Sequence, residues 1–228
     1  SEDNFRRIKV DVPFSYSMDH LPTLIMVDRE GDFWIGNDLS RLILWNRTTN
    51  HYKKVSLSDQ HIPIFHIYQD SKGVIWIATD GYGLYFVDKR DGVIQHITHN
   101  PADPFSLPNN QPSQVLEGRD GVFWIASYNK GINKLPTSKS FFGHYYHQPG
   151  NENTMSAKIA QSVLEDSKKR IWIGTDGGGL NLFDEKRNAF EHFRADPHDP
   201  TSLSSDKILY VLESHDGNLW VCTWDGGL

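Results

Sequence analysis

Seven side chains that could bind a ligand stand in short turns that follow tryptophan-containing segments. They are Asp80, Tyr82, Tyr128, Asn129, Asp176, Trp224 and Asp225. An aromatic ring can cover the apolar C–H face of a sugar, while carboxylates and amides hydrogen-bond its hydroxyl groups. The mixture of these residue types therefore favours a carbohydrate ligand.

The same residues are open to a second interpretation, in which they only shape turns. Asp80, Asp176 and Asp225 each precede a glycine, and Asp-Gly pairs favour turns whether or not a ligand binds. We interpret these three aspartates as one repeated turn position. The aromatic residues of the set differ from one turn to the next, and variation within a repeated scaffold is where specificity can arise.

Catalysis has weaker support from the sequence. A carboxylate pair such as Asp80 with Asp176 could imitate a glycosidase or lyase site if the fold brought the two together. The chain contains no Gly-x-Ser-x-Gly elbow and no phosphate-binding loop. We therefore expect a non-catalytic segment without a cofactor.

The 11 histidines of the chain do not form a metal-binding motif. His96, His144 and His192 are 48 residues apart, and so are His99 and His147. This spacing distributes equivalent histidines over separate repeats, and neither a Cys/His finger nor a zinc-protease helix motif is present. We therefore expect no bound metal.

Composition argues against several other classes of protein. The net charge is −6 and no basic stretch occurs, so we expect no nucleic-acid partner. No run of about 18 apolar residues is present, and we expect no membrane contact by this segment. Cys222 is the single cysteine, and its position is held by glycine or alanine in the other repeats, which indicates packing in a crowded strand.

The elements that position these turns belong to a repeat. The tryptophans Trp34, Trp76, Trp124, Trp172 and Trp220 are 42, 48, 48 and 48 residues apart, each preceded by a similar polar turn. Short apolar runs at a period in this range predict a β-propeller. We interpret the five tryptophans as packing residues that bury a large surface between blades.

Each repeat is predicted to form one blade of four antiparallel strands, A to D from the axis outward. In the fourth repeat these strands cover 161–165, 170–175, 180–183 and 190–194. The predicted fold class is all-β, a single β-propeller region over 1–228 with about five blades represented. The blades are expected at approximately 22–55, 64–98, 113–146, 160–194 and, incomplete, 207–228.

The two ends of the chain are predicted to carry parts of blades. Residues 5–10 resemble a strand D of a preceding or closing blade, and the fifth repeat stops where its strand C should begin. A blade exposes its faces until a neighbour covers them. We favour a fragment of a larger propeller, and the alternative is a five-bladed ring that residues 5–10 close.

Several positions of the repeat return together. Asp-x-x-Gly-x-Ile/Leu-Trp-Ile-Gly/Ala-Thr is followed by Asp-Gly-Gly-Gly-Leu-Asn, a Phe-x-x-Phe strand and Pro-x-x-Pro-x-Ser-Leu, most clearly in 166–193 and 202–228. From Leu24 to Leu228 the chain resembles the two-component-regulator propeller repeat. In that family two seven-bladed propellers form the periplasmic sensor of Bacteroidetes hybrid two-component systems, ahead of a β-sandwich, a membrane helix, a histidine kinase and a response regulator.

The resemblance implies a fragment of a seven-bladed propeller that acts as a non-catalytic periplasmic sensor of glycan oligosaccharide. Its parent chain would be anchored in the inner membrane, form a homodimer and signal to the kinase. The partners implied are an oligosaccharide and the remaining propeller and β-sandwich segments of the parent chain. An interaction scaffold without a small ligand, and less strongly a propeller enzyme acting on polysaccharide, remain alternatives.

Overall fold

The strands of the protein form separate antiparallel sheets, each built from consecutive segments of the chain. The computed structural model describes residues 24–36, 42–58, 60, 62–136 and 142–228. Within them lie four sheets of four strands and a final sheet of two strands, and no helix. The predicted all-β fold of four-stranded antiparallel blades is confirmed. The strand predicted at 5–10 lies outside the described residues.

The first two sheets come from the first half of the chain. They contain β1 (Leu24–Val27), β2 (Phe33–Gly36), β3 (Leu42–Asn46), β4 (His51–Val55), β5 (Ile64–Gln69), β6 (Ile75–Thr79), β7 (Leu84–Asp88) and β8 (Gly92–Ile97). The third, fourth and fifth sheets contain β9 (Pro112–Glu117), β10 (Phe123–Ser127), β11 (Gly131–Leu135), β12 (Gly143–Tyr145), β13 (Ala160–Glu165), β14 (Ile171–Thr175), β15 (Leu180–Asp184), β16 (Ala189–Phe193), β17 (Ile208–Glu213) and β18 (Leu219–Thr223).

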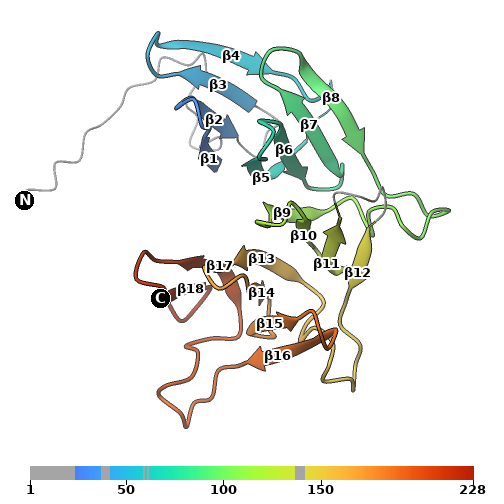
Figure 1. Ribbon diagram of the computed structural model, residues 1–228, viewed down its shortest axis with the longest axis vertical. Coiled ribbons are helices and arrows are strands. Elements are labelled where there is room, and N and C mark those ends of the chain that lie inside the picture. Colours follow the sequence, from blue (N-terminus) through green and yellow to red (C-terminus); the bar gives the residue numbers. More distant parts are fainter. Residues whose placement is uncertain (1–23, 37–41, 59, 61, 137–141) are drawn as a thin grey trace, which may run out of the picture.

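The sheets stand in an arc around a common centre, with β1, β5, β9, β13 and β17 innermost (Figure 1). Each innermost strand contacts the innermost strand of the next sheet. Apolar clusters fill the space between neighbouring sheets, such as the cluster of Trp172, Leu180, Ile208 and Val211 between the fourth and the fifth. This stacking of twisted sheets about an axis is the arrangement of propeller blades.

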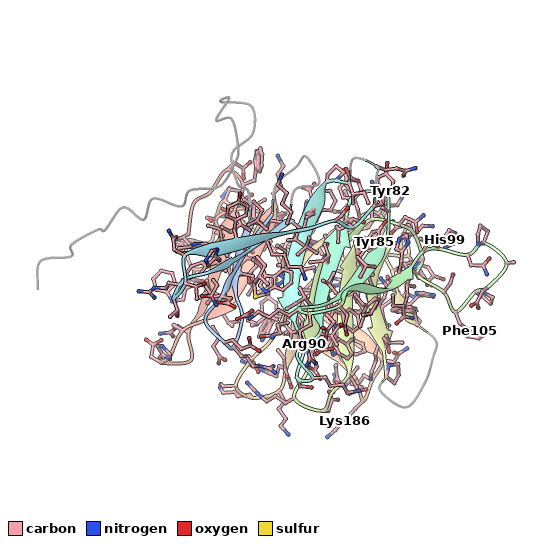
Figure 2. The ribbon with its side chains drawn as sticks, turned by 90° about the horizontal axis from the view of Figure 1, so that it is seen from above. Tyr82, Tyr85, Arg90, His99, Phe105 and Lys186 are labelled. Carbon is pink, nitrogen blue, oxygen red and sulfur yellow. The ribbon has the colours of Figure 1, made fainter. Side chains whose placement is uncertain are left out.

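The turns of the sheets divide between two faces of the arc. Figure 2 shows Tyr82, in the β6–β7 turn, on the face opposite to Arg90 and Lys186, which lie in the β7–β8 and β15–β16 turns. We call the face of Tyr82 the loop face. It carries the turns 79–83, 127–131, 175–179 and 223–227 and the links 98–111, 146–159 and 194–207 that join one sheet to the next.

A carboxylate organises the turn that precedes each of three tryptophans. Asp166 accepts hydrogen bonds from the backbone N–H of Lys168 and Arg170 and, at 2.9 Å, from the indole N–H of Trp172. The same indole contact recurs at Trp34–Asp28 and Trp76–Asp70. Each buried ring is thus oriented by a satisfied polar contact as well as by packing.

Burial of the repeated tryptophans depends on the neighbouring sheet. Trp34, Trp76, Trp124 and Trp172 are 0% to 6% exposed, but Trp220 is 49% exposed. The prediction that every tryptophan is buried between blades is therefore wrong for Trp220. Its sheet is the last of the arc, and no described strand lies on the far side of β18 to cover the ring.

Candidate functional site

One turn position recurs around the loop face. The backbone N–H groups of Asp80, Tyr128, Asp176 and Trp224 donate to the carbonyl oxygens of equivalent link residues at 2.9, 2.9, 3.1 and 2.9 Å. Carboxylates and aromatic rings therefore alternate at this position from sheet to sheet. Asp225 lies one position later, so the interpretation of Asp225 as the register partner of Asp80 and Asp176 is wrong.

The three aspartates of the candidate set have different surroundings. Asp80 is half-buried and accepts a hydrogen bond of 2.8 Å from the side-chain amide of Gln111. Asp225 accepts the Ser205 hydroxyl and lies 3.6 Å from the ammonium group of Lys207, and these contacts lower the pKa of its exposed carboxyl. Asp176 is exposed, and its backbone pairs with the link strand at Lys207.

The aromatic candidates also differ. Trp224 is 72% exposed on the loop face. Tyr82 packs against the apolar cluster between the first two sheets, and its carbonyl oxygen lies 2.6 Å from His96 Nε2. Tyr128 is exposed and lines a cavity at the centre of the arc. Only Trp224 and Tyr128 therefore present much of their rings to a ligand.

The central cavity has a volume of about 430 Å³ and is bounded by residues of all five innermost strands. The side chains of Phe65, Tyr128 and Tyr210 supply exposed aromatic surface, while Gln114 and Gln161 supply amides. Exposed rings next to hydrogen-bonding groups in a concave site suit a ligand with both apolar and polar faces.

Side chains in the innermost strands also connect neighbouring sheets. His66 Nδ1 accepts the Val115 N–H at 3.3 Å, and Gln114 Oε1 accepts the Val163 N–H at 2.8 Å. Burial lowers the pKa of His66 to about 4, so its ring is neutral at pH 7 and keeps the accepting nitrogen. Ser162 occupies the next equivalent position, and its Oγ has no hydrogen-bond partner among the described residues.

A second cavity of about 520 Å³ opens on the loop face beside the β10–β11 turn. Its walls include His99, Asn129, Lys130, His144, His147 and Lys158, and we call it the basic pocket. Asn129, which has a positive φ of 59°, is the member of the predicted set that lines it.

The structure does not bring the seven predicted residues into one site. Tyr128 lines the central cavity and Asn129 the basic pocket, while Asp80, Asp176 and Trp224 line neither cavity. Sequence reasoning missed His66 and the two pocket lysines. Their signal was available, because each stands where other repeats carry a different type of residue.

The described residues include no group of three or more His, Cys, Asp or Glu side chains that could hold a metal ion. The part of the chain that the structure describes also has no helix long and apolar enough to cross a membrane.

The two component regulator propeller family matches residues 56–81, 155–177 and 202–225. Each matched segment runs from the link through an innermost strand and its partner to the loop-face turn. Three segments of the chain thus match two component regulator propeller repeats. The resemblance predicted from the sequence is thereby confirmed. No curated protein is similar enough to the chain to count as a relative.

Several solved structures resemble these propeller repeats. The extracellular domain of a putative hybrid two component system from B. thetaiotaomicron is 22% identical with a TM-score of 0.52, over 86% of this chain and 31% of that one. PorZ, a surface component of the type-IX secretion system of Porphyromonas gingivalis, is 16% identical with a TM-score of 0.71, over 90% of this chain and 31% of that one. Virginiamycin B lyase from Staphylococcus aureus is 17% identical with a TM-score of 0.65, over 89% and 66%. At these low identities the structural similarity shows a shared fold and no more.

The propeller repeats span less than a third of the length of the first two of these structures, at 31% each. They correspond to one part of such larger proteins.

Proposed function

We propose that these propeller repeats form part of the extracytoplasmic sensor of a hybrid two-component system and bind an oligosaccharide on the loop face. The family match and the shared fold with the extracellular domain of a hybrid two component system support the sensor role. In this proposal the kinase belongs to the same parent chain, lies beyond a membrane anchor, and receives a signal when ligand binding favours one of two arrangements.

The observation that carries the ligand proposal is the exposed aromatic surface around the axis. Phe65, Tyr128 and Tyr210 line one cavity together with amide side chains, and Trp224 stands on the same face with most of its ring in water. A ligand that covers exposed rings in a concave site removes apolar surface from water, and this burial favours binding. A sugar offers the C–H faces for the rings and hydroxyl groups for the amides.

We propose further that the two ends of the arc pack against other propeller segments of the parent chain. Ile25 of β1 is 64% exposed, whereas Ile67, which has the equivalent pairing in β5, is 5% exposed. Trp220 shows the same contrast with Trp172 at the other end. The exposed faces are the one that carries Ile25 and the one that carries Trp220. Wherever two described sheets meet, the equivalents of these two faces pack against each other, so each exposed face suits a further blade.

We propose a non-catalytic role. The fold does not decide this, since virginiamycin B lyase shares it. The local geometry favours binding: Asp80 is engaged by Gln111, and Asp176 lines neither of the two cavities. Turnover of a polysaccharide that is lost in Asp176→Asn would contradict this view.

A thermal-shift screen with oligosaccharides tests the ligand proposal, on this chain and on the intact sensor region. A ligand present at 100 times its Kd stabilises the native state by about 2.7 kcal/mol. We expect Tyr128→Ala and Trp224→Ala to reduce the shift. Tyr52→Ala is the matched control, because Tyr52 is an exposed aromatic residue on the outer strand β4.

Three results of this screen would count against the site. An equal loss of the thermal shift in Tyr52→Ala would show that Tyr128→Ala and Trp224→Ala do not act through the proposed site. Stabilisation of the intact region alone would place the site outside these sheets. Absence of any shift in both proteins would contradict glycan sensing altogether.

A further inference from the structure

The basic pocket lies where the third sheet meets the links on either side of it. The β10–β11 turn contributes Asn129 and Lys130, the link 98–111 contributes His99, and the link 146–159 contributes His147 and Lys158. Figure 2 shows His99 at the base of the link that projects from the rim. A volume of about 520 Å³ lies within the range of small-ligand sites, about 300–1,000 Å³.

The pocket concentrates positive charge in a chain whose net charge is −6. Two lysines line it, against the single carboxylate of Asp103, and three histidines add hydrogen-bonding nitrogens. Asp103 already accepts the backbone N–H of the residue two positions later at 2.9 Å. Among the described residues, neither Lys130 nor Lys158 has a side-chain hydrogen bond or an ion pair. Their charges are therefore available to a ligand.

Two of the histidines are held in a defined orientation. His99 Nδ1 lies 2.6 Å from the Leu107 carbonyl oxygen, and His147 Nδ1 lies 2.7 Å from that of Met155. A carbonyl oxygen can only accept, so Nδ1 carries the proton in both rings. In each ring Nε2 has no hydrogen bond from a described residue and can accept one from a ligand hydroxyl.

Lys158 stands at a position where other repeats carry a side chain that accepts a hydrogen bond from the backbone near the start of the link. The equivalent residues 48 positions away are Asn110 and Asp206. Their side-chain oxygens accept the backbone N–H of His99 at 2.6 Å and of Ala195 at 2.7 Å. A lysine has no acceptor, and the described residues provide none for the N–H of His147. Lys158 therefore gives up a local hydrogen bond, and a departure of this kind points to function.

Lys130 also differs from its equivalents. These are Tyr82 in the second sheet and, 48 and 96 positions later, Gly178 and Gly226. An added Cβ at those glycines would come within 2.5 and 2.6 Å of a serine hydroxyl in the adjoining link. In the third sheet the corresponding link residue is Pro108, which lines the pocket instead. Both departures thus place an ammonium group in one cavity.

We propose that the basic pocket binds an anionic group, a carboxylate or a sulfate, carried by the oligosaccharide that the sensor recognises. The inference rests on the proposed function, since it takes the anion to be part of a glycan. The two lysines supply charge, and Nε2 of His99 and of His147 accepts a hydrogen bond from a hydroxyl group of the same sugar. The ligand class is accordingly acidic oligosaccharides.

Isothermal titration calorimetry with matched probes tests this assignment. The probes are a galacturonate trimer, its methyl ester, a sulfated disaccharide and sodium sulfate alone. We expect the acid to bind more tightly than its ester, and the preference to fall with added salt. The response to the sulfated disaccharide, compared with the trimer, decides between the two sources of the anion.

The variants return the pocket to the residues of other repeats. Lys158→Asn and Lys130→Gly are each expected to weaken binding of the acidic probe about tenfold. Lys158→Asn should not lower the melting temperature, because an asparagine can accept the His147 N–H as Asn110 does for His99. Lys72→Asn is the control, since Lys72 is exposed in a turn on the opposite face.

The outcomes separate the two proposals. Equal binding of acid and ester would overturn the pocket assignment and leave oligosaccharide sensing intact. Unchanged affinity in Lys158→Asn and Lys130→Gly, or equal loss in Lys72→Asn, would overturn it too. Binding of sulfate that is lost in Lys158→Asn, without binding of any oligosaccharide, would support the anion pocket and contradict the glycan function.

Discussion

Trp172 and Trp220 occupy the same position of the repeat but should contribute very differently to stability. Trp172 is 6% exposed, packs on the cluster with Val211, and donates its indole N–H to Asp166. Trp220 is 49% exposed, and Ser214 stands where Asp166 stands in the fourth repeat. Replacement of each tryptophan by alanine therefore compares a covered ring with a half-covered one.

The magnitude follows from the buried area. A tryptophan side chain removes about 200 Å² from water, which contributes about 5 kcal/mol at about 25 cal/mol per Å². Trp172→Ala should lower the free energy of unfolding by about that amount. Trp220→Ala should lower it by about half as much, since half of the ring is already in water. We expect a difference of about 2–3 kcal/mol between the two variants.

Urea unfolding followed by far-UV circular dichroism measures this difference in the 228-residue chain. Trp76→Ala is the matched control, because Trp76 is 5% exposed and also donates to an aspartate. It should resemble Trp172→Ala. Equal losses in Trp172→Ala and Trp220→Ala would refute the reasoning, because burial by the neighbouring sheet would then not determine the contribution of the ring.

Two further predictions concern a titrating group and a turn. His66 has a pKa of about 4 in the fold against 6.5 unfolded, so the unfolded chain binds more protons between these values. Stability should fall as pH drops from about 6.5 to about 4, by at most about 3 kcal/mol, and the pH slope of the urea midpoint should flatten in His66→Gln. Gly179 has φ +75° and an added Cβ would lie 2.1 Å from a carbonyl oxygen, whereas Gly177, at φ +88°, has nothing within 4 Å. Gly179→Ala should therefore destabilise the fold by several kcal/mol and Gly177→Ala by about 1 kcal/mol, as measured by urea midpoints; equal effects would contradict the clash.

Much of the fold could be predicted because residues one repeat period apart occupy equivalent positions in neighbouring sheets. Strand β14 was expected at 170–175 and covers Ile171–Thr175, and its pairing with β13 repeats the register of β6 with β5. Local strand ends were less predictable: the third blade was expected to extend over 113–146, but its last strand, β12, covers Gly143–Tyr145. Phe142 is buried, with its N–H bonded to the carbonyl of Phe105.

The exposure of Trp220 could not be predicted in the same way. Its local sequence is that of the other repeats, and only the presence or absence of a covering sheet distinguishes it from Trp172. A pattern within one repeat specifies the side of the strand to which a residue points. It does not specify what lies on that side.

The candidate site was missed for a different reason, which concerns how a repeat should be compared with itself. Residue types that suit a ligand selected Asp80 and Asp176, but an aspartate before a glycine also favours a turn when no ligand binds, so its presence carries little information about function. Lys158 cannot accept the hydrogen bond that Asn110 and Asp206 each accept from a backbone N–H near the start of their link. The repeats of a propeller can be compared with one another position by position. A residue is informative about function when it does not form a hydrogen bond that its equivalents in other repeats form. By that criterion the junction of the third sheet with its two links is where binding should first be sought.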